Sequence, residues 1–217
     1  METEGILSLG VGEPDFPTPW AIREEAIYSL EKGYTNYTSN KGMKEAREAI
    51  LGYIQKKYSL NYDINDEIIL TSGVSEGVDL VFRALLNEGD EVILPEPIYV
   101  CYKPLIQLAR GKVIPIDTSQ SQFVPDPKMI KKVITKKTKA IVLCSPNNPT
   151  GALIPKRILK EIAILAEIHD LWVITDEIYS ELIYEEKYTS FAQLPKMKKR
   201  TICLSGFSKT FAMTGWR

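Results

Sequence analysis

Short apolar runs alternate with helical patterns along most of the chain. The runs, each of a length that suits a buried strand, are EIIL (67–70), EVIL (91–94), KVIPI (112–116), KAIVLC (139–144), LWVIT (171–175) and TICLS (201–205). Between them, apolar residues recur at helical spacing over 74–87, 99–109, 127–134 and 155–169. Continuous apolar strands separated by helices are typical of a parallel sheet covered on both faces. The pattern therefore predicts an α/β protein with three α/β/α layers and a mostly parallel sheet.

The N-terminal part of the chain has a different pattern. Residues 6–17, ILSLGVGEPDFP, are interrupted by glycines and prolines and predict a loop. Thr18 and Pro19 predict a helix start, with Thr18 as the cap and Pro19 in the first turn, and Gly33 ends this helix. A polar and aromatic turn then leads to a second predicted helix over about 43–58.

Polar strings that contain glycine or acidic residues begin where four of the predicted strands end. TSG (71–73) follows the first apolar run, SPNNPTG (145–151) the fourth, DEIY (176–179) the fifth, and SGFSKTFAMTGWR (205–217) the last. The carboxyl ends of parallel strands share one edge of a sheet, and ligands bind in the crevice there. The sequence thus predicts one crevice built from four separate segments.

The composition narrows the class of protein. Of 217 residues, 44% are hydrophobic and 25% are charged, and the net charge of −1 gives no reason to expect nucleic-acid binding. No apolar run approaches about 18 residues and no leader pattern is present, so we expect neither membrane insertion nor secretion. The three cysteines lack CxxC spacing and suit a reducing cytoplasm, and His169 alone cannot form a multi-histidine metal site.

Lys209 lies just past the end of the last predicted strand, in a setting that favours chemistry. Gly206 and Gly215 permit close backbone approach, Ser208 offers a hydroxyl, and Arg217 offers a guanidinium that can bind an anion bidentately. Only a lysine amine can form an imine with an aldehyde and afterwards act as a base. The alternative for a single lysine is a solvated surface charge, but these neighbours together indicate a phosphorylated cofactor.

The string GFSKTFAMTGWR, together with SPNNPTG, resembles the signature of the class I/II aminotransferases, which use pyridoxal 5'-phosphate (PLP) and have fold type I. The resemblance covers nearly all of residues 6–217. It implies that Lys209 forms a Schiff base with PLP, that Arg217 holds the phosphate, and that Asp176 keeps the pyridine nitrogen protonated. It also implies that Asn148 and Tyr179 both hydrogen-bond the phenolic oxygen of PLP.

Other residues match the same family less specifically. The resemblance implies that Tyr99 stacks on the pyridine ring and that the backbone of Gly12, together with Asn148, binds the substrate. Tyr37 matches a tyrosine that reaches the cofactor phosphate of a second subunit, which implies a homodimer with shared active sites. The phosphate-binding turn matches Gly73, Val74 and Ser75.

One position departs from the family pattern. Many relatives carry a phosphate-binding serine three residues before the lysine, where this chain has Gly206. Ser205 or Ser208 is expected to replace it.

Ordinary structural roles compete with several of these assignments. Ser72 or Ser75 could simply cap a helix, and the string NNPTG could form an ordinary turn. Asp176 and Glu177 could lie in a solvated loop or cap a helix. Tyr102 is a plausible core residue.

The resemblance implies a transaminase that moves an amino group between an L-amino acid and a 2-oxo acid, in the branch that handles aspartate, aromatic or related amino acids. A carbon–sulfur β-lyase of the same fold and a non-catalytic fragment are the alternatives. In the family a long C-terminal part follows the lysine motif and supplies the arginine for the substrate carboxylate. We therefore expect a chain truncated before the small domain, with residues 1–40 as an N-terminal arm and first helix and residues 41–217 as an incomplete PLP-binding large domain.

Overall fold

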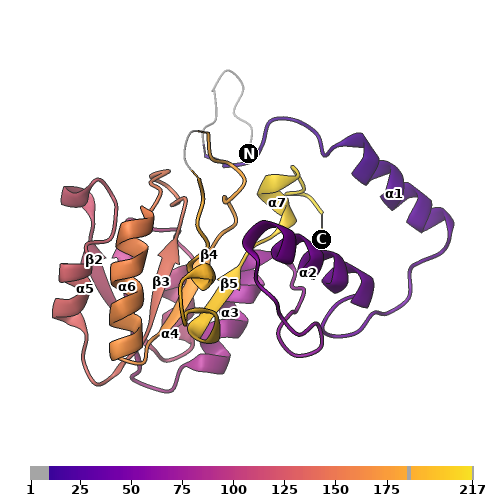
Figure 1. Ribbon diagram of the computed structural model, residues 1–217. Coiled ribbons are helices and arrows are strands. Elements are labelled where there is room, and N and C mark those ends of the chain that lie inside the picture. The colour runs from indigo at the N-terminus through magenta and orange to yellow at the C-terminus, as the bar shows by residue number, and fades with distance from the viewer. Residues whose placement is uncertain (1–9, 185–186, 217) are drawn as a thin grey trace.

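The fold is built on a five-stranded sheet in which every neighbouring pair of strands is parallel. A computed structural model describes residues 10–184 and 187–216 of the chain. The strand order is β2-β1-β3-β4-β5. Figure 1 shows β2, β3, β4 and β5 in this order. The strands are β1 (Glu91–Glu96), β2 (Lys112–Asp117), β3 (Thr138–Cys144), β4 (Trp172–Asp176) and β5 (Thr201–Leu204). The predicted α/β class with a mostly parallel sheet is confirmed.

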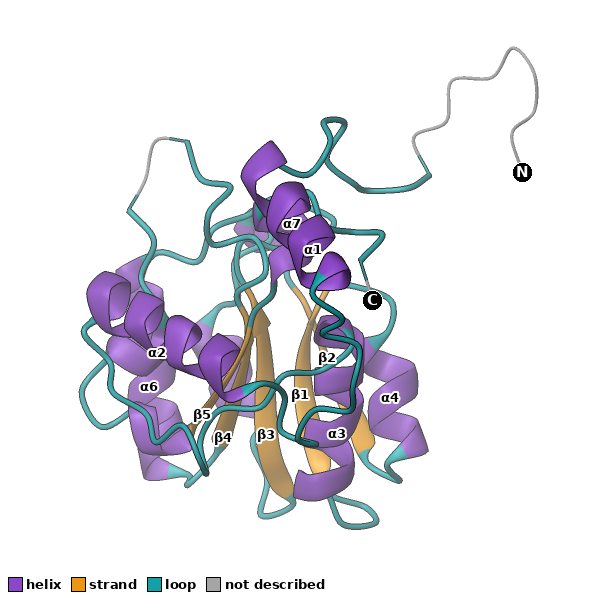
Figure 2. Cartoon of the chain, turned by 90° about the vertical axis from the view of Figure 1, so that its right-hand side faces the viewer, coloured by secondary structure: helices purple, strands orange, loops and turns teal. Residues whose placement is uncertain are grey.

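Helices cover both faces of this sheet (Figure 2). Helices α3 and α4 lie against one face, and α5 and α6 lie against the other. The helices are α1 (Trp20–Glu31), α2 (Lys44–Tyr58), α3 (Gly73–Leu85), α4 (Tyr102–Leu108), α5 (Pro127–Val133), α6 (Lys156–Ile168) and α7 (Phe207–Thr210). Three short 3-10 helices are η1 (Ser119–Ser121), η2 (Phe191–Gln193) and η3 (Lys198–Arg200).

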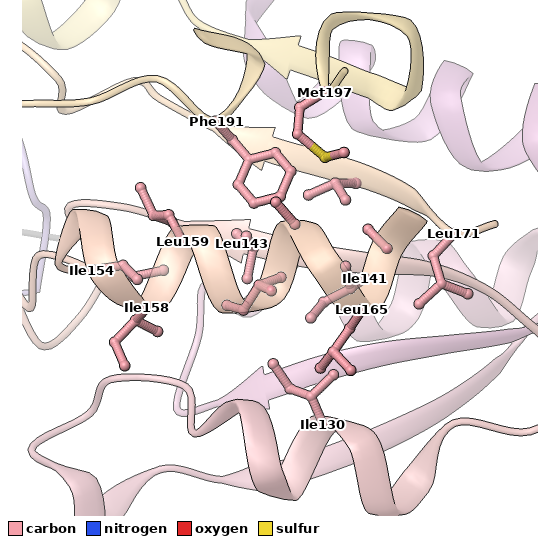
Figure 3. Close-up of a cluster of buried hydrophobic side chains, with 14 of the residues drawn as sticks. Ile130, Ile141, Leu143, Ile154, Ile158, Leu159, Leu165, Leu171, Phe191 and Met197 are labelled. Atoms are coloured by element: carbon pink, nitrogen blue, oxygen red, sulfur yellow. The ribbon is translucent and has the colours of Figure 1, made fainter. Parts of the chain in front are cut away.

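Two hydrophobic cores follow from the alternation of side chains along the strands. In β3, Ile141 and Leu143 face α5 and α6, while Ala140 and Val142 face α3 and α4. Figure 3 shows the first of these cores, where side chains of β3 and α6 meet Phe191 from η2. Strands buried on both faces need apolar residues at consecutive positions, which explains why the sequence signal was a continuous run.

The predicted strand at 67–70 is wrong, because this segment is not part of the sheet. The backbone N–H of Leu70 donates to the carbonyl oxygen of Lys41 at 3.0 Å, and the Ile69 side chain is 57% exposed. A strand needs a neighbouring strand, and an apolar run alone does not supply one. TSG (71–73) therefore follows an extended loop segment rather than a strand.

The predicted cap of the first helix is also wrong. Helix α1 begins after Pro19 and has no side-chain cap. The buried Thr18 hydroxyl instead donates to the carbonyl oxygen of Ala212 at 2.5 Å and accepts from Trp216 Nε1 at 3.0 Å. These long-range partners outcompete a local cap, and they join the start of the chain to the segment after α7.

Candidate functional site

Three of the four predicted site strings meet at one edge of the sheet, where the neighbouring strands β3, β4 and β5 end in register. Cys144 at the end of β3 pairs with Asp176 at the end of β4, and Asp176 pairs with Leu204 at the end of β5. The segments 145–151, 177–179 and 205–210 therefore leave the sheet side by side. The order of the strands reverses between β1 and β3, the position where open α/β sheets bind ligands.

Asp176 is a buried carboxylate with a partner on each oxygen. Oδ1 accepts the backbone N–H of Ile178 at 3.0 Å, and Oδ2 accepts the hydroxyl of Tyr102 in a very short hydrogen bond. Loss of hydration raises the pKa of the carboxyl above its usual range, while these two hydrogen bonds act in the opposite direction. The solvated-loop alternative for Asp176 and Glu177 is wrong, since both side chains are buried.

Asn148 and Tyr179 come from different loops and contact each other. The Asn148 side-chain amide donates to the Tyr179 hydroxyl at 3.2 Å. The turn around Asn148 is held by Asn147, whose Nδ2 donates to the carbonyl oxygen of Pro97 at 3.3 Å and whose Oδ1 accepts from the Thr150 hydroxyl at 3.0 Å. The NNPTG string is thus a turn, as the ordinary alternative holds, and that turn presents Asn148 to Tyr179.

Lys209 lies in α7, one short turn beyond β5. Its Nζ donates a hydrogen bond to the carbonyl oxygen of Gly12. The structure therefore brings together the lysine predicted to hold the cofactor and the glycine predicted to bind substrate.

The first turn of α3 lies beside the start of α7. A Cβ built on Gly206 would lie 3.6 Å from Val74 Cγ2 and 3.2 Å from Ile178 Cδ1. Gly73 has a positive φ of 79°, which favours glycine. The Ser72 side chain makes no capping hydrogen bond, so side-chain capping by Ser72 is wrong. The N–H of Gly73 donates to the carbonyl oxygen of Thr71 at 2.8 Å.

The remaining predicted site residues differ in how far they are exposed to solvent. The Tyr99 ring is partly exposed and meets the Tyr102 ring edge-on, with centroids 6.0 Å apart. Tyr37 is fully exposed, and Ser205 is exposed while Ser208 is half-buried. Arg217, the predicted phosphate ligand, lies outside the described residues.

Two buried polar residues near the site were not assigned a functional role from the sequence. Tyr102 bonds Asp176 as described above. Glu177 accepts from the Ser190 hydroxyl at 2.8 Å and from the Thr175 hydroxyl at 3.1 Å, and burial raises the pKa of its carboxyl. The sequence pattern did not distinguish Tyr102 from an ordinary core residue, because its partner Asp176 lies 74 positions later in the chain.

Within residues 10–184 and 187–216, no group of three or more His, Cys, Asp or Glu side chains is arranged to hold a metal ion. None of the helices within these ranges has the length and apolar character needed to cross a membrane.

Comparison with known proteins gives a consistent result. The model of the family "Aminotransferase class I and II" matches residues 4–217. The Bacillus subtilis protein YugH is 50% identical over 99% of this chain and 56% of its own length, and the aspartate aminotransferase of Pyrococcus abyssi is 44% identical over 98% and 55%. The solved aromatic aminotransferase of Pyrococcus horikoshii superimposes with a TM-score of 0.96 at 42% identity, over 100% of this chain and 58% of that one.

The chain thus spans just over half the length of the relatives it matches. Within that span, the sequence match, the parallel sheet and the polar residues at the carboxyl ends of the strands all indicate the same family. The chain belongs to the class I and II aminotransferase family.

Proposed function

We propose that this chain is the cofactor-binding part of a PLP-dependent aminotransferase, which moves an amino group between an L-amino acid and a 2-oxo acid. Members of the family are generally PLP-dependent. The observation that carries the proposal is the arrangement at the edge of the sheet. The buried acid Asp176 and the Asn148–Tyr179 pair lie next to the segment that carries Lys209.

The donors and acceptors at this edge fit the functional groups of PLP. The N-terminal turn of α3, with Gly73 at positive φ, suits a phosphate. A buried carboxylate at Asp176 suits a protonated pyridine nitrogen, and the amide of Asn148 with the phenol of Tyr179 suits a phenolate oxygen. The Lys209 amine suits the aldehyde. When bound, PLP supplies an electron sink for the pair of electrons left on the substrate Cα.

Each of these side chains then has a defined task. The ionised Asp176 favours a cationic ring nitrogen, because an opposite charge in a partly desolvated site stabilises the charged form. Asn148 and Tyr179 hold an oxygen between two donors from separate loops. Lys209 Nζ is the group that would take a proton from the Cα of the amino-acid substrate and, in the second half of the cycle, give a proton to the Cα formed from the 2-oxo acid. Its hydrogen bond to the Gly12 carbonyl places it next to the segment proposed to bind the substrate.

The proposal also covers the substrate class of the enzyme and its assembly into a homodimer. Relatives named for aspartate and for aromatic amino acids support a substrate among these amino acids. The full exposure of Tyr37 suits a side chain that completes the site of a second subunit in a homodimer. The expected cytoplasmic location, the division at residue 40 and the replacement of the missing serine by Ser205 or Ser208 stay predictions.

Absorbance spectroscopy with added PLP tests the proposal. We expect the chain to give an absorbance band in the visible region that is absent in Lys209→Ala and present in Lys199→Ala, a control at an exposed lysine. Loss of the band in both variants, or in neither, would contradict the role of Lys209.

Activity assays separate the reaction classes. In a protein that carries this chain together with a C-terminal part like that of its relatives, we expect 2-oxo acid formation from aspartate or an aromatic amino acid. We expect the 217-residue chain alone to have negligible activity. Release of pyruvate and thiol from cystathionine would favour a β-lyase instead.

A further inference from the structure

Tyr102 links two residues that the proposed function uses for different tasks. Its hydroxyl donates to Asp176 Oδ2, and its ring contacts the Tyr99 ring edge-on at a centroid distance of 6.0 Å and an interplanar angle of 81°. We propose that Tyr102 is a positioning residue, which orients the carboxylate of Asp176, favours its ionised form and supports the ring of Tyr99. This inference rests on the proposed function for the roles of Asp176 and Tyr99.

The two hydrogen bonds of Asp176 come from different elements. The backbone N–H of Ile178 holds Oδ1 from the chain that follows β4, and Tyr102 holds Oδ2 from the start of α4. A carboxylate rotates about a single terminal bond, so donors on both oxygens fix its plane. It offers about four lone-pair positions, and these two donors leave about two for a ligand. Tyr102 therefore orients the acid without blocking it.

The ionised form of the Asp176 carboxyl is stabilised by hydrogen bonds. In the described part of the chain it forms no ion pair. The titratable groups that face it are the phenols Tyr102 and Tyr179 and the thiols Cys101 and Cys144, and burial raises the pKa of each. All four are neutral near pH 7. The donors that stabilise the carboxylate are thus Tyr102 and the Ile178 N–H, which lower its pKa against the effect of burial.

Tyr102 is suited to act only as a donor. Its side chain is fully buried, and burial raises the pKa of its hydroxyl far above the physiological range, next to the charge of Asp176. A phenol that stays protonated near neutral pH remains a donor to the carboxylate. A phenylalanine at this position would keep the ring contact with Tyr99 and remove the donor, whereas a leucine would remove both.

The first measurement uses the protein without PLP. Thermal unfolding is followed from about pH 5 to pH 8 for the unsubstituted protein, Tyr102→Phe, Asp176→Asn and the double variant. The pKa of Asp176 is raised by folding, so its carboxylate destabilises the fold at high pH, and stability returns as the pH falls through the folded pKa. Removal of the Tyr102 hydroxyl raises that pKa further. We therefore expect Tyr102→Phe to lower the unfolding midpoint most at high pH, with the deficit shrinking as the solution is acidified.

The other variants give the controls. In the Asp176→Asn background the effect of Tyr102→Phe should no longer depend on pH. Tyr62→Phe removes another tyrosine hydroxyl, which interacts with Cys203, Glu177 and Glu67 rather than with Asp176, so its effect should be the same with and without Asp176→Asn. A deficit in Tyr102→Phe that is the same at all pH values, with or without Asp176, would overturn the inference.

The second measurement is PLP binding, followed by fluorescence or equilibrium dialysis. We expect Tyr102→Phe to weaken binding about tenfold at pH 7 and to move the acid limb of the binding profile up by about one pH unit, the shift typical of losing a charged hydrogen bond. Tyr102→Leu should weaken binding further, because Tyr99 loses its support. If the unsubstituted protein fails to bind PLP while the pH-dependent coupling is present, the proposed function fails and the coupling stands. Normal PLP binding without coupling would overturn the role of Tyr102 alone.

Discussion

Lys209 Nζ donates a hydrogen bond to the carbonyl oxygen of Gly12, 197 positions earlier in the chain. Two further hydrogen bonds join the same two segments of the chain. The Thr214 hydroxyl donates to Glu13 at 2.8 Å, and the Thr18 hydroxyl donates to the carbonyl oxygen of Ala212 at 2.5 Å. The segment 12–18 is therefore held along the segment that carries Lys209. In the proposed enzyme, this arrangement places a substrate-binding loop next to the catalytic amine.

Thr18→Val should loosen this contact between the two segments. Valine keeps the shape of threonine but loses the hydroxyl that bonds Ala212 and Trp216, so we expect a loss of about 1–3 kcal/mol in unfolding free energy. Limited proteolysis should also cut the loop before α1 faster. Thr35→Val is the control, because its exposed hydroxyl has only a long contact of 3.5 Å to the Gly33 carbonyl. Equal effects of the two substitutions would contradict the role of Thr18.

Gly73→Ala tests the proposed anion site at the start of α3. Gly73 has φ of 79°, where an alanine costs about 1–2 kcal/mol, so the variant should be less stable and should bind inorganic phosphate and PLP more weakly. Gly52→Ala is the control, and we expect it to stabilise the protein instead. Gly52 lies in α2 with open space around its Cβ position, and an alanine in a helix stabilises by about 1 kcal/mol relative to glycine. Denaturant unfolding and phosphate titration of both variants measure the two effects, and unchanged phosphate binding by Gly73→Ala would speak against the site.

Glu177→Gln should reduce the pH dependence of stability. Burial raises the pKa of the Glu177 carboxyl, so its charged form costs stability above the folded pKa, and this cost disappears as the pH falls toward the unfolded value. A glutamine cannot ionise, so on acidification the variant should gain less stability than the unsubstituted protein. Glu161→Gln, at an exposed position in α6, should leave the pH dependence unchanged. Parallel pH profiles for Glu177→Gln and the unsubstituted protein would contradict this account.

The sequence predicted the sheet because its central strands β1, β3 and β4 are buried on both faces and therefore form continuous apolar runs in the sequence. It could not exclude 67–70 as a strand, since the same local pattern forms an extended loop when no neighbouring strand pairs with it. It also could not show that Thr18 bonds Ala212 rather than capping α1, because that choice depends on residues far along the chain. Local patterns determine elements, while partners depend on the folded arrangement.

The same distinction holds within the candidate site. The strings that carry Asn148, Asp176 and Lys209 could be located because each follows a recognisable strand. Tyr102 and Glu177 could not be assigned a functional role, because a buried hydrogen bond between separate elements leaves no periodic signal in the sequence. Their roles became visible only with their partners.

Gly206→Ser tests the position where this chain departs from the family pattern. A Cβ at residue 206 would lie 3.2 Å from Cδ1 of the buried Ile178, which is closer than ordinary van der Waals contact, so we expect a cost of about 1 kcal/mol in stability. Ile178→Val removes that Cδ1 atom and should itself cost about 0.5–1.5 kcal/mol. Because the two residues compete for one space, the double variant should be more stable than the sum of the single effects predicts. If the new hydroxyl reaches the phosphate, PLP should bind more tightly to Gly206→Ser despite its lower stability. Additive effects in denaturant unfolding would show that Ile178 is not what excludes a side chain at residue 206.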